Sequence, residues 1–250
     1  MRSPPTHFVV FTTQRNGSTW FMSVLNGLDG VAAHGELFLP RRRSEEERWD
    51  SDFARPRYVE YQENSGGARP FSIFKYLDAF YRSKDATGFK LMYSQLRLFP
   101  ELLPYLARKN IRVVHLVRRN HLDVLVSFAI KRQIDQAHVL INQDRPTGIT
   151  VNIPVDSLLR DVRRLQFKHD FGRALLRVSR LRHVEITYEE LVTNQLRFSD
   201  VLRFLDIPPS VELPASNIVK SRLGSQREVI SNYDEVRRVL AGSRFTHLLE

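Results

Sequence analysis

Short apolar runs alternate with longer amphipathic segments along this chain, and this alternation limits its fold more than any other feature. The first run, His7 to Thr13, is β-branched and aromatic, which suits a buried strand. Further strands are predicted at Val31 to Ala33, Gly88 to Met92, Ile111 to Val117 and His183 to Thr187. Helices are predicted at Ser18 to Asn26, Ser72 to Ser83, Pro100 to Lys109, Asn120 to Lys131, Asp156 to Val178 and Asn194 to Leu205. Strands alternating with helices indicate an α/β fold, in which helices cover both faces of a central parallel sheet.

The length of 250 residues is that of one large α/β domain. We therefore expect a single domain over residues 1–250, with three layers. Two polar stretches, near residues 40–70 and 134–154, are too long for ordinary connections. They are expected to be irregular insertions that act as lids or substrate loops.

Composition excludes several kinds of chemistry. The chain has no cysteine, so disulfides, cysteine–zinc sites, iron–sulfur clusters and thiol nucleophiles are ruled out. Its 8 histidines show no close metal-ligand spacing, and we predict no metal site. The net charge of +10 attracts anions but does not choose between nucleotide, nucleic acid and membrane surface.

No apolar run approaches the ~20 residues that span a bilayer, and no targeting signal is visible, which predicts a soluble, cytoplasmic chain. The sequence leaves open whether a membrane anchor was trimmed.

The loop after the first strand, Thr12 to Thr19, has the length of a phosphate-binding loop. In the nucleoside-triphosphate pattern G-x-x-x-x-G-K-[ST], Gly17 and Thr19 fit, but Thr12 replaces the first glycine and Ser18 replaces the lysine. Transfer of a γ-phosphoryl group needs that lysine and Mg²⁺. Backbone amides at a helix start can still bind an anion. The loop thus predicts a phosphate-type ligand held without a metal, and an ordinary strand–turn–helix corner is the alternative.

A second feature follows the strand that ends at Val117. Arg119 lies at the carboxyl end of this strand, and Ser127 lies eight residues later in the predicted helix. In parallel sheets, ligands bind beyond the carboxyl ends of the strands. Arg119 and Ser127 could therefore contact one phosphate group from two sides.

Together these segments resemble sulfotransferases that use 3′-phosphoadenylyl sulfate (PAPS). Gln14 to Trp20 resembles their loop for the 5′-phosphosulfate, and Arg119 to Ser127 resembles their 3′-phosphate motif, spacing included. Thr187 to Leu191 is similar to the family's segment with a tyrosine beside the adenine. Taken jointly, the matching motifs extend in order from residue 8 to about residue 240.

Other segments resemble one branch of that family, the bacterial carbohydrate enzymes typified by trehalose sulfotransferase. These segments are Gly88 to Met92 and His34 to Phe38. Lys220 to Asn232 resembles the C-terminal loop that closes over the nucleotide. There are also departures: Arg15 stands where many cytosolic members have lysine, and Met92 to Gln95 lacks their catalytic histidine. The C-terminal loop also lacks their Arg-Lys-Gly triplet.

The resemblance implies a PAPS-dependent enzyme that transfers a sulfuryl group, without a metal, to a small-molecule hydroxyl of a carbohydrate, glycosylated or lipid metabolite. It implies no nucleic-acid partner and leaves a homodimer open. The residues expected to bind the cofactor are Arg15, Asn16, Gly17, Ser18, Thr19, Trp20, Arg119, Ser127, Tyr188, Lys220, Ser221 and Arg222. Which residue of 220–222 holds the 3′-phosphate is left open. The residues expected to be catalytic are Glu36, Arg15 and His34.

For four residues, a purely structural role is the alternative to the functional one. Glu36 is preferred to His34 as the base because the carbohydrate branch places a glutamate there, but it could instead order the acceptor or pair with an arginine. Trp20 could be core, and Tyr188 could stack on adenine or cover the sheet edge. Lys90 could reach the acceptor or extend along the surface with its charge in water.

Two other functions compete with the sulfotransferase. A P-loop nucleotide kinase or other phosphotransferase is the alternative enzyme, and the missing loop lysine argues against it. A nucleic-acid-binding domain would use the positive charge, but no basic–aromatic recognition motif is present. The acceptor itself cannot be identified from the sequence.

Overall fold

The computed structural model describes residues 6–42, 56–82, 86–134, 139–140, 149–208, 218–219 and 224–249. The chain divides into two compact units, which are described separately here. The first unit comprises Met1–Val117 and Gly172–Ser216, and the second comprises Arg118–Phe171 and Asn217–Glu250.

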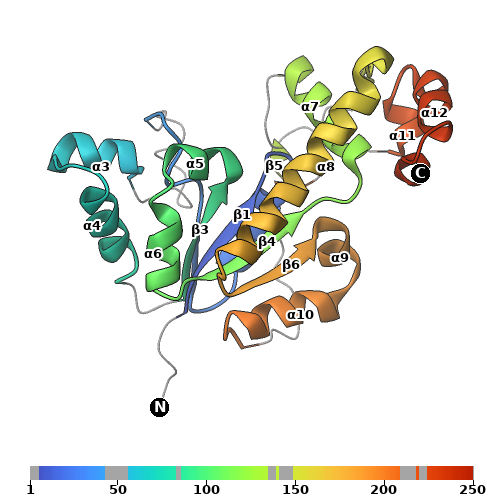
Figure 1. Cartoon of the computed structure of the whole chain (residues 1–250). Helices are drawn as coiled ribbons and strands as arrows, with labels where there is room; N and C mark the ends of the chain where they lie inside the picture. Colours follow the sequence, from blue (N-terminus) through green and yellow to red (C-terminus); the bar gives the residue numbers. More distant parts are fainter. Residues whose placement is uncertain are drawn as a thin grey trace. The chain divides into compact units, whose positions relative to one another are not determined.

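A five-stranded parallel sheet forms the centre of the first unit (Figure 1). Its strands are β1 His7–Thr12, β2 Val31–His34, β3 Ala86–Met92, β4 Arg112–Val117 and β6 His183–Thr187. Their spatial order is β2-β3-β1-β4-β6, and every neighbouring pair is parallel. The predicted α/β class, with a central parallel sheet flanked by helices, is confirmed.

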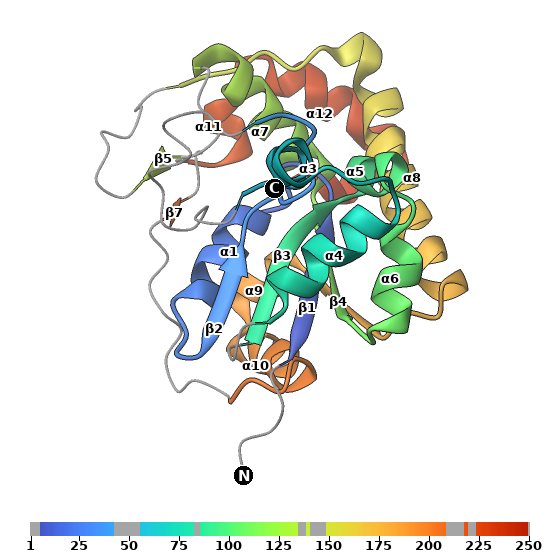
Figure 2. The ribbon, with the colours of Figure 1, turned by 90° about the vertical axis from the view of Figure 1, so that its left-hand side faces the viewer.

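Successive residues of β1 point to opposite faces of the sheet and enter two different cores. Phe8 and Val10 pack with residues of α1 (Ser18–Asn26) and α10 (Gln195–Phe204). Val9 and Phe11 pack with residues of α4 (Phe71–Phe80), α6 (Leu102–Arg108) and the end of α8 (Val155–Val178). Figure 2 shows α1 and α6 on opposite sides of the sheet. This two-sided burial explains why the strands read as unbroken apolar runs.

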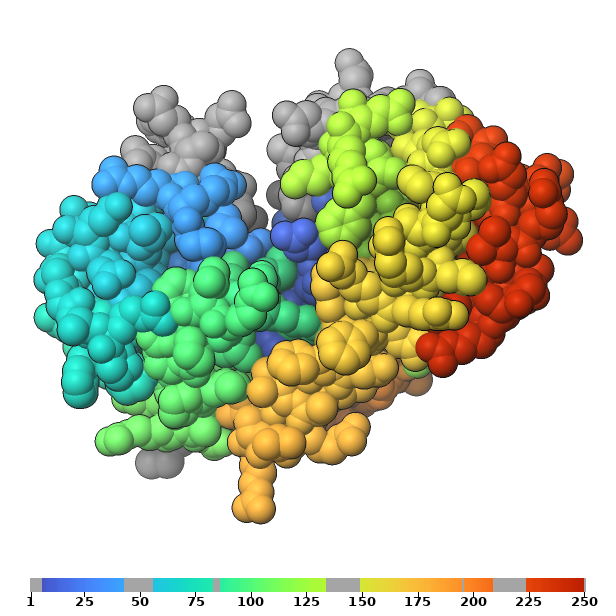
Figure 3. Space-filling model, turned by 45° about the horizontal axis from the view of Figure 1, so that its top comes forward, coloured from blue at the N-terminus to red at the C-terminus, as the bar shows by residue number. Residues whose placement is uncertain are grey.

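Three helices of the first unit were not predicted. They are α3 Tyr58–Ser65, α5 Tyr93–Leu98 and α9 Tyr188–Thr193. The helix α3 lies within the stretch that was expected to be irregular, where Tyr58 is buried in the core. In Figure 3, α3 and α4 (cyan) lie beside α5 and α6 (green). The helices α5 and α9 each follow a strand without a connecting loop, so no turn signal separates them from it.

The second unit has its own hydrophobic core. It contains α7 (His121–Ile134), the first part of α8 (Val155–Val178), α11 (Gln226–Val229), α12 (Tyr233–Ala241) and the short helix η2 (Thr246–Leu248). Two short strands, β5 (Val139–Leu140) and β7 (Ile218–Val219), pair in antiparallel fashion. In the described part of the chain, none of the helices is long and apolar enough to cross a membrane. Whether the whole chain acts as one domain with two insertions stays a prediction.

Candidate functional site

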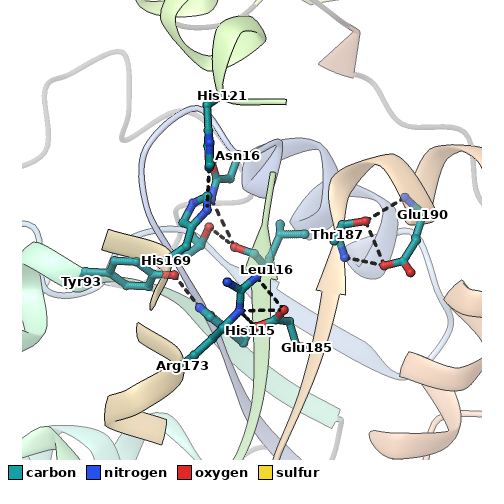
Figure 4. A network of polar contacts seen from close by, with 11 residues as sticks. Asn16, Tyr93, His115, Leu116, His121, His169, Arg173, Glu185, Thr187 and Glu190 are labelled. Atoms are coloured by element: carbon teal, nitrogen blue, oxygen red, sulfur yellow. Dashed lines mark hydrogen bonds and ion pairs between the residues drawn. The ribbon is translucent and has the colours of Figure 1, made fainter. Parts of the chain in front are cut away.

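The predicted phosphate-binding loop, Thr12 to Thr19, follows the central strand of the sheet. It follows β1, which pairs with β3 on one side and with β4 on the other. The connection after β1 leads to β2 on one side, and the connection after β4 leads to β6 on the other, and such switch points open a crevice at the carboxyl ends of the strands. The hydroxyl of Thr12 donates to the carbonyl of Leu116 at 2.7 Å, and the Asn16 amide donates to the same oxygen at 3.4 Å. The loop is therefore attached to the neighbouring strand as well as to its own (Figure 4).

The loop backbone turns through two left-handed residues before the helix begins. Arg15 has φ 65° and Gly17 has φ 78°. Gly17 is the N-cap of α1, and as a glycine it has no side chain of its own to cap this end of the helix. The amides of the first turn and the partial positive charge of the helix N-terminus together favour an anion. The geometry suits the predicted phosphate group, whose position among Arg15, Ser18 and Thr19 stays a prediction.

Gly17 is in close contact with the ring of Tyr188. A Cβ atom at position 17 would lie 2.2 Å from Cδ2 of Tyr188. Tyr188 is 7% exposed, and Trp20 packs edge-on against it with ring centroids 5.8 Å apart. The three residues form one aromatic corner at the start of α1. Glycine is needed at position 17 for both its dihedral angle and its size.

Glu36, the predicted base, is linked to the loop helix through Lys90. The Nζ atom of Lys90 lies 3.1 Å from Oε1 of Glu36 and donates to the Thr19 hydroxyl at 3.4 Å. Gln95 donates to the other oxygen of Glu36 at 2.7 Å. Lys90 is only 7% exposed, so the alternative of a surface lysine is wrong. The cation beside Glu36 is a lysine, where the sequence suggested an arginine.

His34 and Glu36 have different surroundings although they are two residues apart. His34 ends β2, the edge strand, and its ring packs edge-on against Phe80 with centroids 5.2 Å apart. Glu36 follows the strand and contacts two polar side chains. The strand β3 separates β2 from β1, so Lys90 on β3 bridges the gap between Glu36 and the loop helix.

Comparisons with known proteins find sulfotransferases among the solved structures that this chain is similar to. No protein-family model matches the chain, and no curated protein matches it. It is similar to a sulfotransferase from Alicyclobacillus acidocaldarius, with 13% identity and a TM-score of 0.48 over 98% of this chain and 93% of that one. It is also similar to the sulfotransferase domain from the curacin biosynthetic pathway, with 16% identity and a TM-score of 0.44 over 99% and 84% of the two chains.

A third similar structure is that of the mouse sulfotransferase SULT7A1 complexed with PAP. The match has 12% identity and a TM-score of 0.44 over 84% of this chain. This chain spans 62% of the mouse protein's length. At such identities and TM-scores, these likenesses assign no activity to the chain.

The predicted 3′-phosphate residues belong to the second unit. Arg119 is exposed and precedes α7, and Ser127 is half-buried within α7. The preceding Arg118 forms an ion pair with Asp123 at 2.7 Å, and Gln226 donates to the other oxygen of Asp123 at 3.1 Å. Gln226 thus ties α11 to the start of α7, which sequence reasoning missed. The remaining predicted residues, Lys220, Ser221 and Arg222, lie outside the described residues.

In the ranges that the structure describes, no group of three or more His, Asp or Glu side chains could hold a metal ion.

Sequence reasoning also missed a partly buried polar network behind the loop. It joins Tyr93, His115, Arg173 and Glu185, and each of these residues comes from a different helix or strand (Figure 4). His115 lies in the middle of an apolar strand and is 0% exposed. A fully buried histidine needs polar partners, and this single residue was the available signal in the sequence.

Proposed function

We propose that this chain is a sulfotransferase that moves a sulfuryl group from PAPS to a hydroxyl of a carbohydrate, glycosylated or lipid metabolite. The observation that carries the proposal is the contact chain from Glu36 through Lys90 to Thr19. It connects a carboxylate able to accept a proton with the helix start at Gly17 that suits a phosphate. These are the two groups that sulfuryl transfer requires on opposite sides of the sulfur.

In the reaction, the acceptor oxygen attacks sulfur while the bond from sulfur to the 5′-phosphate oxygen breaks. The acceptor proton passes to the Glu36 carboxylate, and adenosine 3′,5′-bisphosphate (PAP) leaves. A positioned base typically contributes about 10²–10⁴-fold to such a rate. By analogy with phosphoryl transfer, most of the remaining acceleration comes from alignment and from stabilising charge on the leaving phosphate.

The loop supplies donors for that leaving phosphate. We assign this role to the amides of the first turn of α1, to the side chains of Ser18 and Thr19, and to Arg15. Arginine is always charged, so Arg15 stabilises the leaving group without giving it a proton. Lys90, held between Glu36 and Thr19, adds a second cation on the path from acceptor to leaving group.

The rest of the donor is assigned by the sequence resemblance. Arg119 and Ser127, with a residue of 220–222, hold the 3′-phosphate, which distinguishes PAPS from ATP. A charge-assisted hydrogen bond of this kind contributes about 1.5–3 kcal/mol. Tyr188 and Trp20 lie beside the adenine, at the aromatic corner around Gly17. The proposal includes no metal and a cytoplasmic location.

The test is incubation of the protein with ³⁵S-labelled PAPS and a mixed metabolite extract, followed by identification of the labelled product. Glu36→Gln keeps the side-chain shape, so we expect it to bind PAP nearly as well and to lose about 10²-fold or more in turnover. If His34→Asn lost its activity while an equally stable Glu36→Gln stayed active, the base would be His34 and not Glu36. Turnover of Mg-ATP without label transfer from PAPS would favour the kinase alternative instead.

A further inference from the structure

The partly buried network behind the loop is fully connected by hydrogen bonds. Nδ1 of His115, on β4, lies 2.9 Å from Oε2 of Glu185, on β6. Arg173, on α8, donates to both oxygens of Glu185, with Nε 2.8 Å from Oε2 and a terminal nitrogen 3.0 Å from Oε1. Nε2 of His115 lies 2.5 Å from the hydroxyl of Tyr93. Figure 4 shows these side chains converging on His115.

The direction of the hydrogen bonds to Glu185 follows from its charge. Burial opposes ionisation of Glu185, but hydrogen bonds from His115 and Arg173 outweigh it and lower the pKa of Glu185 to about 2. Glu185 is therefore a carboxylate that only accepts, and Nδ1 of His115 carries the proton that it donates. Burial raises the pKa of Tyr93, so its hydroxyl stays protonated, and this hydroxyl shares a hydrogen bond with Nε2 of His115.

The helix α8 carries a glycine where this network needs space. A Cβ atom at Gly172 would lie 2.9 Å from the hydroxyl oxygen of Tyr93 and 3.0 Å from Nε2 of His115. Glycine inside a helix is unfavourable compared with alanine. Its presence next to Arg173 indicates that α8 is shaped to keep Tyr93 and His115 in contact.

Tyr93 is also the first residue of α5, the helix whose Gln95 contacts the predicted base Glu36. Two residues later, Oε1 of Gln95 accepts from the backbone amide of Met92 at 3.0 Å. This bond fixes the orientation of the Gln95 amide, so its Nε2 is the atom that faces Glu36, at 2.7 Å. Gln95 is 2% exposed, which leaves its side chain little freedom. The position of the Glu36 carboxylate therefore depends on where α5 begins.

We propose that Tyr93 is a positioning residue for Glu36. Held by His115, Glu185 and Arg173, it fixes the start of α5, and Gln95 then orients the Glu36 carboxylate for proton transfer. This inference rests on the proposed function for the role of Glu36 as a base. The structural part, that Tyr93 fixes α5 and Gln95, can be tested without any activity.

The first test is the kinetics of Tyr93→Phe. This variant keeps the ring that packs on Phe11, with centroids 4.5 Å apart, and removes only the hydroxyl. We expect kcat to fall about 10-fold, the loss that corresponds to one net hydrogen bond, with an unchanged KM for PAPS. In a Gln95→Ala background, Tyr93→Phe should cause no further loss, because the effect passes through Gln95. An equal loss in both backgrounds would overturn the proposal.

The matched control is Tyr105→Phe. The Tyr105 hydroxyl donates to Asp78 at 2.9 Å and lies on α6, outside the network. Its loss removes a comparable hydrogen bond, and we expect kcat to stay unchanged. A similar fall of kcat in both variants would mean that Tyr93 acts through general stability, against the proposal.

The second test is backbone amide hydrogen exchange over residues 92–99 in the free protein. We expect faster exchange in Tyr93→Phe, above all at Met92, whose amide donates to Gln95, and no change there in Tyr105→Phe. Unchanged exchange in Tyr93→Phe would overturn the proposal, whatever the activity. If the wild-type protein transfers no sulfuryl group, the proposed function fails, and the exchange result still decides whether Tyr93 fixes α5.

Discussion

Substitution of Gly17 by alanine should destabilise the protein through two separable effects. The first is backbone strain, because φ at Gly17 is 78° and a left-handed conformation costs a non-glycine residue about 1–2 kcal/mol. The second is overpacking, because the new Cβ would lie 2.2 Å from the buried Tyr188 ring, and such crowding typically costs about 1–3 kcal/mol. Together they predict a loss of about 2–5 kcal/mol in the free energy of unfolding.

Gly30→Ala is the matched control for the strain. Gly30 has a similar φ of 71°, but nothing lies within 4 Å of a Cβ atom placed there. The control should therefore lose only about 1–2 kcal/mol. The excess loss in Gly17→Ala then measures the contact with Tyr188 alone.

Urea unfolding, followed by circular dichroism, measures both variants on the same scale. In a Tyr188→Ala background, Gly17→Ala should cost no more than Gly30→Ala does, because the ring that crowds it is absent. If Gly17→Ala costs only as much as Gly30→Ala in the wild-type background, the contact between Gly17 and Tyr188 is not tight and the reasoning is refuted.

Three further predictions concern charge. The depressed pKa of Glu185, from its ordinary 4.5 to about 2, means that its ion pairs stabilise the fold above pH 4.5 and lose this effect as pH falls toward 2. Because its side chain is 32% exposed, we expect Glu185→Gln to cost about 1–2 kcal/mol at pH 7 and almost nothing at pH 2, measured by urea titrations; equal costs would contradict this. PAP without added metal should raise the melting temperature, and at a concentration of 100 Kd it should stabilise the fold by about 2.7 kcal/mol. Adenosine monophosphate should raise the melting temperature far less, and equal shifts would refute a 3′-phosphate site at Arg119 and Ser127. Arg15→Ala should lower kcat far more than affinity for PAP, with partial rescue by Arg15→Lys, whereas a change in KM alone would make Arg15 a binding group only.

The elements that the sequence predicted well are those whose signal is local. Ser18–Asn26 and His183–Thr187 have the predicted bounds, because buried strands and an amphipathic helix leave a pattern in consecutive residues. The helix α5 has only six residues, and its start depends on Tyr93 meeting His115 from another strand. No window of sequence contains both residues, so this helix could not be predicted.

The candidate site divides in the same way. The loop was predicted, since its residues are consecutive. The contact between Glu36 and Lys90 joins residues that are far apart in the chain, and the sequence left Lys90 undecided between site and surface. The burial of Lys90 places it in the site, because a lysine with 7% exposure requires a partner such as Glu36.

The position of β1 has a consequence for biosynthesis. Among the five strands of the described sheet it is synthesised first, and it is also the middle strand, with Phe8, Val9 and Val10 fully buried. Its partner β4 follows about a hundred residues later, and Thr12 and Leu116, which share a hydrogen bond, are 104 positions apart. At a synthesis rate of about 5–20 residues per second, roughly 5–20 s pass between the synthesis of β1 and that of β4. A nascent chain that stopped at Met92 would expose one open edge of β1, and we expect it to require a chaperone to stay in solution.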